Sequence, residues 1–273
     1  MKESIAVYSL FRDSEPYLAR TLSQFEGLES LDYNFEYYFY ENDSTDNTVQ
    51  ILEDWLKNRS GKFLHEKLKE KKFGSVPDME RMELLTMCRN KCKKLLSDSS
   101  SKYTILVDSD IFFNKENLER HIEFLKINTS CVLSTPNVRQ NIFDYARCKT
   151  DDSYYDTHAI IDLSGDKPIK FSDCPFRGDA DIFKWNMGIP VECLSAFGGF
   201  SLTYTNILKE VEWSTDGLCE HVNFCSELRK HGSVCVDSRN KVSVVHEESY
   251  VKEIHDLFVS RREFHMKSIK TQE

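Results

Sequence analysis

The chain has 273 residues, and 40% of them are hydrophobic, so it is long enough to bury one large core. Its 36 Lys and Arg residues against 45 Asp and Glu residues give a net charge of -9. That balance argues against a general nucleic-acid binder, because no basic excess is present to neutralise a phosphate backbone. Any contact with phosphate is therefore expected to be local.

The longest apolar runs, such as residues 103–107 and 131–133, are far shorter than the roughly 20 residues that span a bilayer. We therefore predict no transmembrane helix. The first residues lead directly into a strand pattern without the apolar region of a secretory signal, which predicts a cytoplasmic protein. The nine cysteines lack CxxC spacing, so we expect small buried thiols rather than a zinc site or disulfides.

In the first half, short apolar runs alternate with amphipathic stretches, which predicts a βαβ sheet with helices on both faces. A first helix is predicted after residues 13–16, which supply cap residues and an early proline. A second helix is predicted after Asp46, which caps it, and a third over residues 79–96. Strands are predicted over residues 4–10, 35–40, 62–68 and 103–107.

The pattern weakens between Asn137 and Pro190, where we expect long loops over the face that carries the active site. Aromatic residues in this stretch either stack on an acceptor sugar or fill a local core. They are Phe143, Tyr145, Tyr154 and Tyr155. Regular structure is predicted again over 191–204, as a helix over 220–230, as strands over 233–236 and 242–245, and as a basic terminal helix through His265.

Two carboxylates, Asp108 and Asp110, follow the hydrophobic run of 103–107 directly. In open α/β sheets the carboxyl ends of the strands bind the ligand. Hard oxygen ligands at that position suit Mg²⁺ or Mn²⁺, which neutralises the charge on a departing diphosphate. A solvated, helix-capping turn is the alternative interpretation of the tripeptide taken alone.

A second polar loop, residues 41–48, follows the strand pattern of 35–40. Its side chains are able either to read a nucleobase edge or to cap the helix behind it. We favour binding for Glu41 and Asn42, and leave both alternatives open for residues 44–46. Arg12, after the first strand, is either a phosphate ligand or a solvated surface charge.

These motifs together resemble the GT-A glycosyltransferases. The matching segments occur in the family's order and are Glu41–Thr48, Cys88-Arg89-Asn90, Asp108-Ser109-Asp110, Ser195–Phe200 and Cys219-Glu220-His221. The residue sequence of the first loop resembles the capsule-type mannosyltransferase and viral branches of the family more than its other branches. The resemblance implies a GT-A fold, with a mixed, mostly parallel sheet flanked by helices.

The resemblance also implies roles for individual residues. Gly198 and Gly199 correspond to the glycine loop beneath the donor sugar, and a tight turn between two strands is the alternative. Arg89, like Arg12, is a candidate ligand of the diphosphate or nucleoside, because a guanidinium suits phosphate oxygens. Glu220 is the implied base that deprotonates the acceptor hydroxyl, with His221 as its rival. His246, just after a late strand, is the implied third metal ligand beside Asp108 and Asp110, and Asp108 alternatively binds the ribose.

The sequence therefore predicts a metal-dependent glycosyltransferase, a hexosyl- or pentosyltransferase using a UDP- or GDP-sugar donor and a glycan or glycoprotein acceptor. We expect one domain over 1–273, with a donor half (about 1–110), an acceptor half (about 111–247) and a C-terminal helix (248–273). The alternatives are a sugar nucleotidylyltransferase, which usually opens with a glycine-rich basic loop absent from residues 7–14, and a catalytically silent nucleotide-sugar-binding protein.

Overall fold

The computed structural model describes residues 2–73, 78–144, 149–170, 172–216 and 219–244, with the backbone alone for 141–144 and 149–151. The helices in these residues are α1 (Glu15–Leu28), α2 (Thr48–Leu56), α3 (Met79–Leu95), α4 (Lys115–Ile127), α5 (Asp179–Met187), α6 (Thr205–Glu210) and α7 (Glu220–Leu228). The strands are β1 (Ser4–Phe11), β2 (Asn34–Asn42), β3 (Gly61–Glu66), β4 (Tyr103–Asp108), β5 (Ile111–Phe112), β6 (Cys131–Asp144), β7 (Lys149–Tyr154), β8 (Ile161–Asp162), β9 (Val191–Ser195), β10 (Phe200–Tyr204) and β11 (Ser233–Val244).

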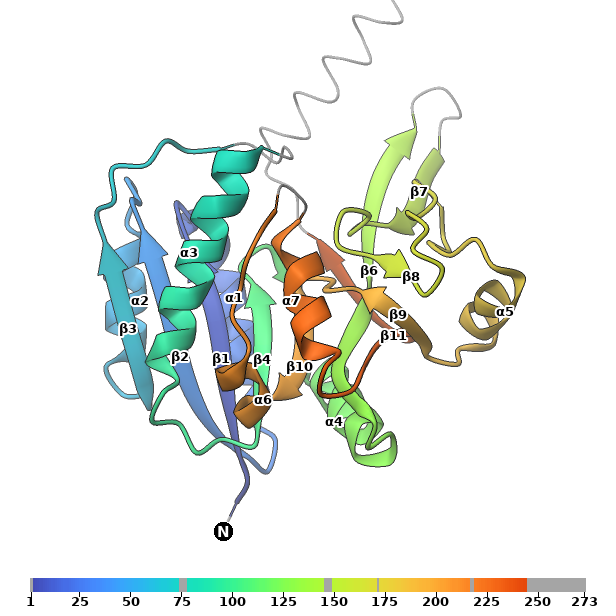
Figure 1. The fold of residues 1–273 in the computed structure, drawn as a ribbon. Coiled ribbons are helices and arrows are strands. Elements are labelled where there is room, and N and C mark those ends of the chain that lie inside the picture. The colour runs from blue at the N-terminus through green and yellow to red at the C-terminus, as the bar shows by residue number, and fades with distance from the viewer. Residues whose placement is uncertain (1, 74–77, 145–148, 171, 217–218, 245–273) are drawn as a thin grey trace, which may run out of the picture.

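The described strands form one sheet in the order β3-β2-β1-β4-β10-β6-β11-β9-β8, with β5 on β11 and β7 on β6 (Figure 1). Strands β1 to β4, β6, β8 and β11 share one direction. The others, β5, β7, β9 and β10, run in the opposite direction. The predicted fold class, a mixed and mostly parallel sheet flanked by helices, is confirmed.

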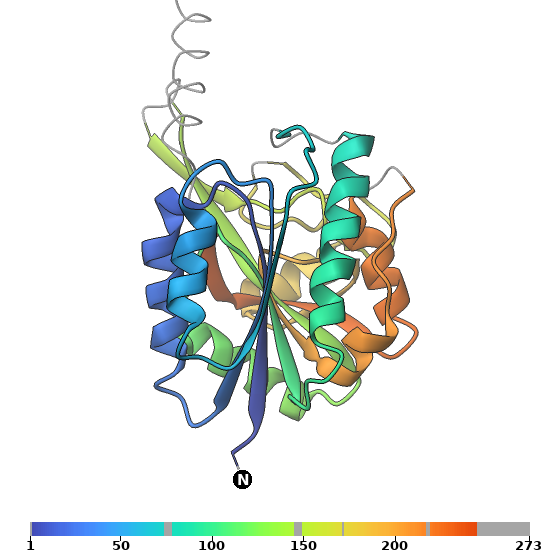
Figure 2. The ribbon, with the colours of Figure 1, turned by 90° about the vertical axis from the view of Figure 1, so that its left-hand side faces the viewer.

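Helices cover both faces of the sheet, as the first half of the sequence predicts. Figure 2 shows α1 and α2 on one side of the sheet and α3 with α7 on the other. Between these layers, β1 and β4 are almost wholly buried, which explains their continuous apolar sequences. The site-bearing end of β4 is therefore fixed by packing on both faces.

The helix starts differ slightly from the prediction at Asp46. The α2 helix begins at Thr48, and its N-cap position is Asn47, whose side chain makes no capping hydrogen bond. Asp46 still caps the helix, because its Oδ1 accepts the backbone N–H of Thr48 at 3.0 Å. The predicted capping role is retained one residue outside the usual position.

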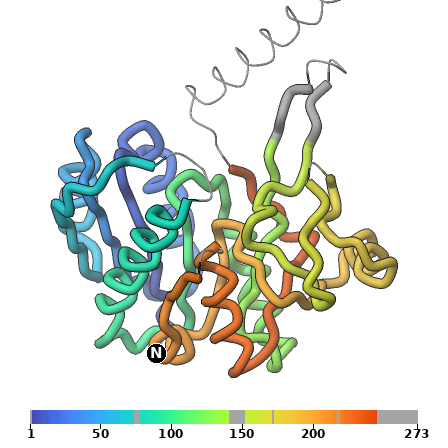
Figure 3. The backbone as a smooth tube through the Cα atoms, turned by 45° about the horizontal axis from the view of Figure 1, so that its top comes forward, coloured from blue at the N-terminus to red at the C-terminus, as the bar shows by residue number. Residues whose placement is uncertain are grey.

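The stretch from Asn137 to Pro190 is more regular than the predicted long loops. It contains most of β6, the paired strand β7, the short β8 and helix α5, which Figure 3 shows on the side away from β2 and β3. The strand pattern was hidden because β6 buries polar residues. Arg139, for example, is only 3% exposed, and its charge is compensated by ion pairs with Asp152 and Asp173. In the sequence, a charged residue at such a position is typical of a loop.

The acceptor-stacking hypothesis is wrong for Tyr154. This ring is fully buried and packs edge-on against Trp185, so the local-core alternative applies. Tyr155 is half-buried. The side chains of Phe143 and Tyr145 lie outside the described residues.

The two predicted late strands are one strand, β11, with a register shift between Asp237 and Lys241. His246 and the predicted terminal helix lie outside the described residues. None of the described helices is long and apolar enough to cross a membrane. The described cysteines are all free, and most are buried, as expected.

Phe25 joins α1 to the sheet, which yields a stability prediction. Its buried ring lies 5.7 Å from Phe39 and 5.8 Å from Phe113, between ring centroids. Phe25→Ala should lower the free energy of unfolding by about 3–5 kcal/mol, because it leaves a cavity in this aromatic cluster. Urea denaturation measures this. Ile127→Ala, at a side chain that is 71% exposed, is the control and should change stability by less than about 0.5 kcal/mol.

Candidate active site

The loops that follow β1 and β2 are hydrogen-bonded to each other. Ser44 Oγ accepts the backbone N–H of Asp13 at 2.8 Å, and Asp13 Oδ1 accepts the N–H of Thr45 at 2.7 Å. Asp46 Oδ2 accepts the N–H of Glu15 at 3.1 Å. Asp13 has a positive φ of 44°, which these bonds hold in place. The two strand ends therefore form one rigid platform.

Glu41 and Asn42 lie inside this platform rather than on its surface. Glu41 is 1% exposed, and its Oε1 accepts the N–H of Ser44 at 2.7 Å. Asn42 is 6% exposed and accepts a weak hydrogen bond from the thiol of Cys88 at 3.5 Å. Glu41 thus shapes its own loop, and a role in reading the base remains a prediction.

Arg12 binds backbone after β3 rather than pointing into solvent. Its Nη1 and Nη2 donate to the carbonyl oxygens of Lys71 and Glu70, at 3.1 and 2.6 Å. Its Nε is buried and has no hydrogen-bond partner among the described residues. The guanidinium therefore anchors the 67–73 segment to the platform.

Arg89, from the middle of α3, is the centre of a buried charged cluster. The side chain is only 6% exposed. Its Nε donates to Glu220 Oε1 at 3.2 Å, and its Nη2 lies 3.5 Å from Asp108 Oδ1 and 3.2 Å from His221 Nε2. Three elements distant in sequence, α3, β4 and the start of α7, therefore meet at one guanidinium.

Two aromatic rings enclose this guanidinium. Its Cζ lies 5.1 Å from the ring centroid of Phe197 and 4.8 Å from that of Trp213, within the range of cation–π attraction. Asn90 positions Trp213, because its side-chain amide donates to the carbonyl of Trp213 at 2.8 Å and accepts its N–H at 3.0 Å. His221 stacks on Phe197 with centroids 3.8 Å apart.

Electrostatics keep Glu220 ionised and His221 neutral. Burial opposes the charged form of Glu220, but His221 and Arg89 outweigh it and lower the pKa of Glu220 to about 2. Burial lowers the pKa of His221 to about 3, although Glu220 opposes this. Because His221 is neutral at pH 7, the permanent charge of Arg89 is the cause that acts there. Arg89 Nη2 and Glu220 Oε1 lie 3.2 and 3.4 Å from His221 Nε2, and Nδ1 of the ring is buried without a hydrogen-bond partner among the described residues.

The double glycine brings backbone beside the end of β4. Gly198 and Gly199 have φ values of 69° and 66°, in the left-handed region that favours glycine. A Cβ at Gly199 would lie 2.6 Å from Ile111 Cδ1 and 3.7 Å from Asp108 Oδ2, so only glycine fits against the Ile111 side chain here. The carbonyl of Gly199 also accepts the N–H of Asp108 at 2.9 Å.

Asp156, which sequence reasoning did not single out, binds the same glycine loop. Its Oδ2 accepts the N–H of Gly198 at 2.8 Å. Burial, with the negative charges of Asp108 and Glu220, raises the pKa of Asp156 to about 6 against the opposing bond from Gly198. The residue sits in a stretch with no recognisable motif, so no sequence signal pointed to it. Trp213 was also missed, and its rarity as one of three tryptophans was the available signal.

Asp108 and Asp110 are both partly exposed at the end of β4, as a ligand site requires. Burial raises the pKa of Asp108, although the charge of Arg89 opposes the shift. The turn between them is held by Thr21, whose hydroxyl donates to the carbonyl of Ser109 at 2.8 Å. Asp110 lies near enough to Arg20 to act on its pKa, which burial lowers.

The structure thus brings together Arg89, Asp108, the double glycine, Glu220 and His221. Arg12, Glu41 and Asn42 belong to the neighbouring ends of β1 and β2 in the same sheet. His246 is outside the described residues.

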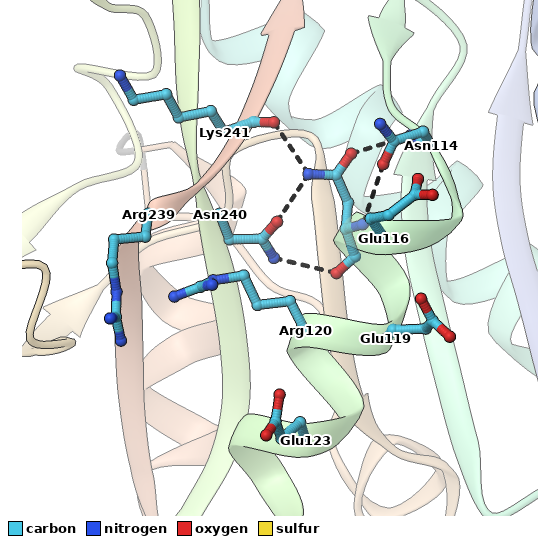
Figure 4. A pocket seen from close by; sticks show the side chains of 9 residues that line it. Asn114, Glu116, Glu119, Arg120, Glu123, Arg239, Asn240 and Lys241 are labelled. Carbon is cyan, nitrogen blue, oxygen red and sulfur yellow. Dashed lines mark hydrogen bonds between the residues drawn. The ribbon is translucent and has the colours of Figure 1, made fainter.

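A pocket of about 470 Å³ lies elsewhere, between α4 and the bend in β11 (Figure 4). Its polar groups satisfy one another: Asn117 Nδ2 donates to Asn240 Oδ1 at 2.7 Å, and Asn240 Nδ2 donates to the carbonyl of Asn117 at 3.1 Å. Asn114 forms a capping box with Asn117. The polar groups that line this pocket therefore serve to attach α4 to the bend in β11.

No family model matches the chain, and no curated protein matches it. Among solved structures, residues 1–349 of TarS from S. aureus in complex with UDP-GlcNAc match with a TM-score of 0.55 and 15% identity, over 90% of this chain and 59% of that chain. Mannosyltransferase PcManGT from Pyrobaculum calidifontis, in complex with GDP-Man and Mn²⁺, matches with a TM-score of 0.55 and 9% identity, over 91% and 58%. The chain has a GT-A-like glycosyltransferase fold. It spans about 60% of the length of these structures.

The pairing of Arg89 with Glu220 should stabilise the GT-A-like fold in a pH-dependent way. The pKa of Glu220 falls from its ordinary 4.5 to about 2 on folding, so the pair contributes fully above about pH 4.5 and is lost as the pH falls toward 2. The difference in free energy of unfolding between the wild type and Glu220→Gln should therefore shrink from pH 7 to pH 3. Urea denaturation at both values measures it.

Arg89→Met provides the matched comparison. It leaves Glu220 buried without its cation and should cost about 3–5 kcal/mol at pH 7. The double variant Arg89→Met/Glu220→Gln should recover part of that loss. A double variant less stable than Arg89→Met would contradict the pairing.

Proposed function

We propose that this protein is a metal-dependent glycosyltransferase that moves a sugar from a nucleotide diphosphate sugar to a hydroxyl of a glycan or protein-linked acceptor. The observation that carries this proposal is the cluster around Arg89. It places a strand-end Asp-x-Asp, a glycine loop and an acidic helix start together in a GT-A-like fold. The structures with similar folds support it, since they contain UDP-GlcNAc, UDP or GDP-Man.

The metal would be held by Asp108 and Asp110, with His246, which lies outside the described residues, as the third ligand. Both carboxylates are partly exposed, and they lie two residues apart where β4 ends. Carboxylate oxygens suit Mg²⁺ or Mn²⁺, so the residues fit such an ion. When bound, the ion would neutralise the charge that develops on the departing diphosphate.

Two carboxylates compete for the role of base toward the acceptor hydroxyl. Glu220, the residue implied by the resemblance, is 2% exposed and committed to Arg89. Asp156 is partly exposed, and no cation pairs with it among the described residues. A base needs access to its proton and a pKa near the working pH, and Asp156 has a pKa of about 6. We therefore propose Asp156 as the base and Glu220 as the residue that positions Arg89.

The donor and the metal are tested together. A panel of UDP- and GDP-sugars with Mn²⁺ should show release of nucleoside diphosphate from one base class. Calorimetry with that nucleoside diphosphate should show an affinity about a hundredfold lower in a chelator, because the diphosphate would face Asp108 and Asp110 directly. Asp110→Ala should remove the metal dependence while the thermal unfolding curve persists. Equal affinity with and without chelator would refute the metal site.

Replacing the carboxylate of Asp156 or of Glu220 should affect the rate of sugar transfer differently. Asp156→Asn should reduce transfer roughly a hundredfold or more, with nucleoside diphosphate affinity nearly unchanged. Glu220→Gln should reduce transfer less and should lower stability at pH 7. Steady-state kinetics and calorimetry on both variants, with His221→Asn as the neighbouring control, measure this. A larger transfer loss in a stable Glu220→Gln protein would return the role to Glu220.

A further inference from the structure

The turn between Asp108 and Asp110 is held by two neighbouring side chains of α1. The hydroxyl of Thr21 donates to the carbonyl of Ser109 at 2.8 Å, and Arg20 Nη2 donates to the same oxygen at 3.3 Å. Thr21 is fully buried, and Arg20 is half-buried. Two donors from one helix therefore fix the carbonyl that lies between the two carboxylates in the sequence.

The residues that follow Asp110 are held as well. Gln24, about one helical turn after Arg20, donates from Nε2 to the carbonyl of Ile111 at 3.0 Å, and its Oε1 accepts the N–H of Phe113 at 3.2 Å. On the other side of this segment, β5 pairs with the end of β11. These contacts fix the backbone of the turn independently of Arg20.

Bond geometry places the guanidinium of Arg20 close to Asp110. The carbonyl oxygen of Ser109 lies about 2.8 Å from the Cα atom of Asp110, because one planar peptide bond joins them. Arg20 Nη2, which donates to that oxygen at 3.3 Å, therefore lies at most about 6 Å from this Cα atom. Burial lowers the pKa of Arg20, and the negative charge of Asp110 opposes that shift. The two opposite charges therefore act on each other.

The permanent charge of Arg20 opposes a cation at this turn and favours an anion. Arg89 Nη2 lies 3.5 Å from Asp108 Oδ1, so each carboxylate of the Asp-x-Asp motif has one arginine near it. Glu220 and Asp156 add negative charge to the site, but their carboxylates bind Arg89 and the glycine loop. Arg20 is therefore the cation placed to act on an ion at the second carboxylate of the motif.

We propose that Arg20 is a positioning residue of the donor site that sets the balance between the two ligands of that site. It acts through the turn of Asp110, where it weakens the binding of a divalent ion alone and strengthens the binding of a nucleoside diphosphate alone. The inference rests on the proposed transferase function and adds how its metal site is regulated. The consequence for turnover is that the ion is bound firmly only while the diphosphate is also present, and leaves together with the spent nucleotide.

The experiment measures Mn²⁺ binding to the full chain from the electron paramagnetic resonance signal of free Mn²⁺. Arg20→Gln should bind Mn²⁺ alone about tenfold more tightly than the wild type, because the repulsion between a guanidinium and a doubly charged ion about 8–10 Å away is removed. By calorimetry in a chelator, the same variant should bind UDP or GDP about threefold to tenfold more weakly. Arg20→Lys keeps the charge and should stay within about threefold of the wild type for both ligands. Damage to the turn would weaken both ligands, so changes of opposite sign identify an effect of charge.

Arg59→Gln is the matched control. Arg59 is also half-buried, and its Nη1 donates to the carbonyl of Trp55 at 3.0 Å. It lies just before β3, which runs parallel to β4, so it is at the opposite edge of the sheet from Asp110. Its replacement should change neither the Mn²⁺ affinity nor the nucleotide affinity.

Unchanged or weaker Mn²⁺ binding by Arg20→Gln, in a protein whose thermal unfolding matches the wild type, would overturn the inference. If Asp110→Ala then still abolished Mn²⁺ binding, the metal site would stand without a role for Arg20. Absence of Mn²⁺ binding in the wild type and the variant, with UDP and GDP present, would overturn the metal site and the inference together. A wild type that binds Mn²⁺ but releases no nucleoside diphosphate from any donor would refute the proposed transferase function instead.

Discussion

The buried positive charge of Arg89 is the constraint on which the arrangement of the site depends. A guanidinium removed from water is tolerated only when carboxylates and hydrogen-bond acceptors surround it. Asp108 from β4 and Glu220 from α7 supply that compensation, and Phe197 and Trp213 cover its faces. The positions of three separate elements are therefore coupled through one side chain.

The same cation divides the carboxylates of the site into different classes. Glu220 is held ionised and inaccessible beside Arg89, whereas Asp156 is partly exposed and has a raised pKa. Asp108 lies between these situations, because it touches Arg89 and remains open at the strand end. Chemically identical carboxyl groups thus differ in pKa and in accessibility because their surroundings differ.

The sequence by itself determined the α/β class and the position of Asp108 at a strand end, because both follow from local periodicity and from strand direction. It also pointed to Arg89 and Glu220 through their motifs. Only the tertiary structure decided that Glu41 is buried within its own loop and that Tyr154 belongs to the hydrophobic core. It also decided that Arg89 forms a buried ion pair with Glu220. Asp156 was missed for the same reason: what a charged side chain does depends on partners distant in sequence, and the local sequence pattern does not identify those partners.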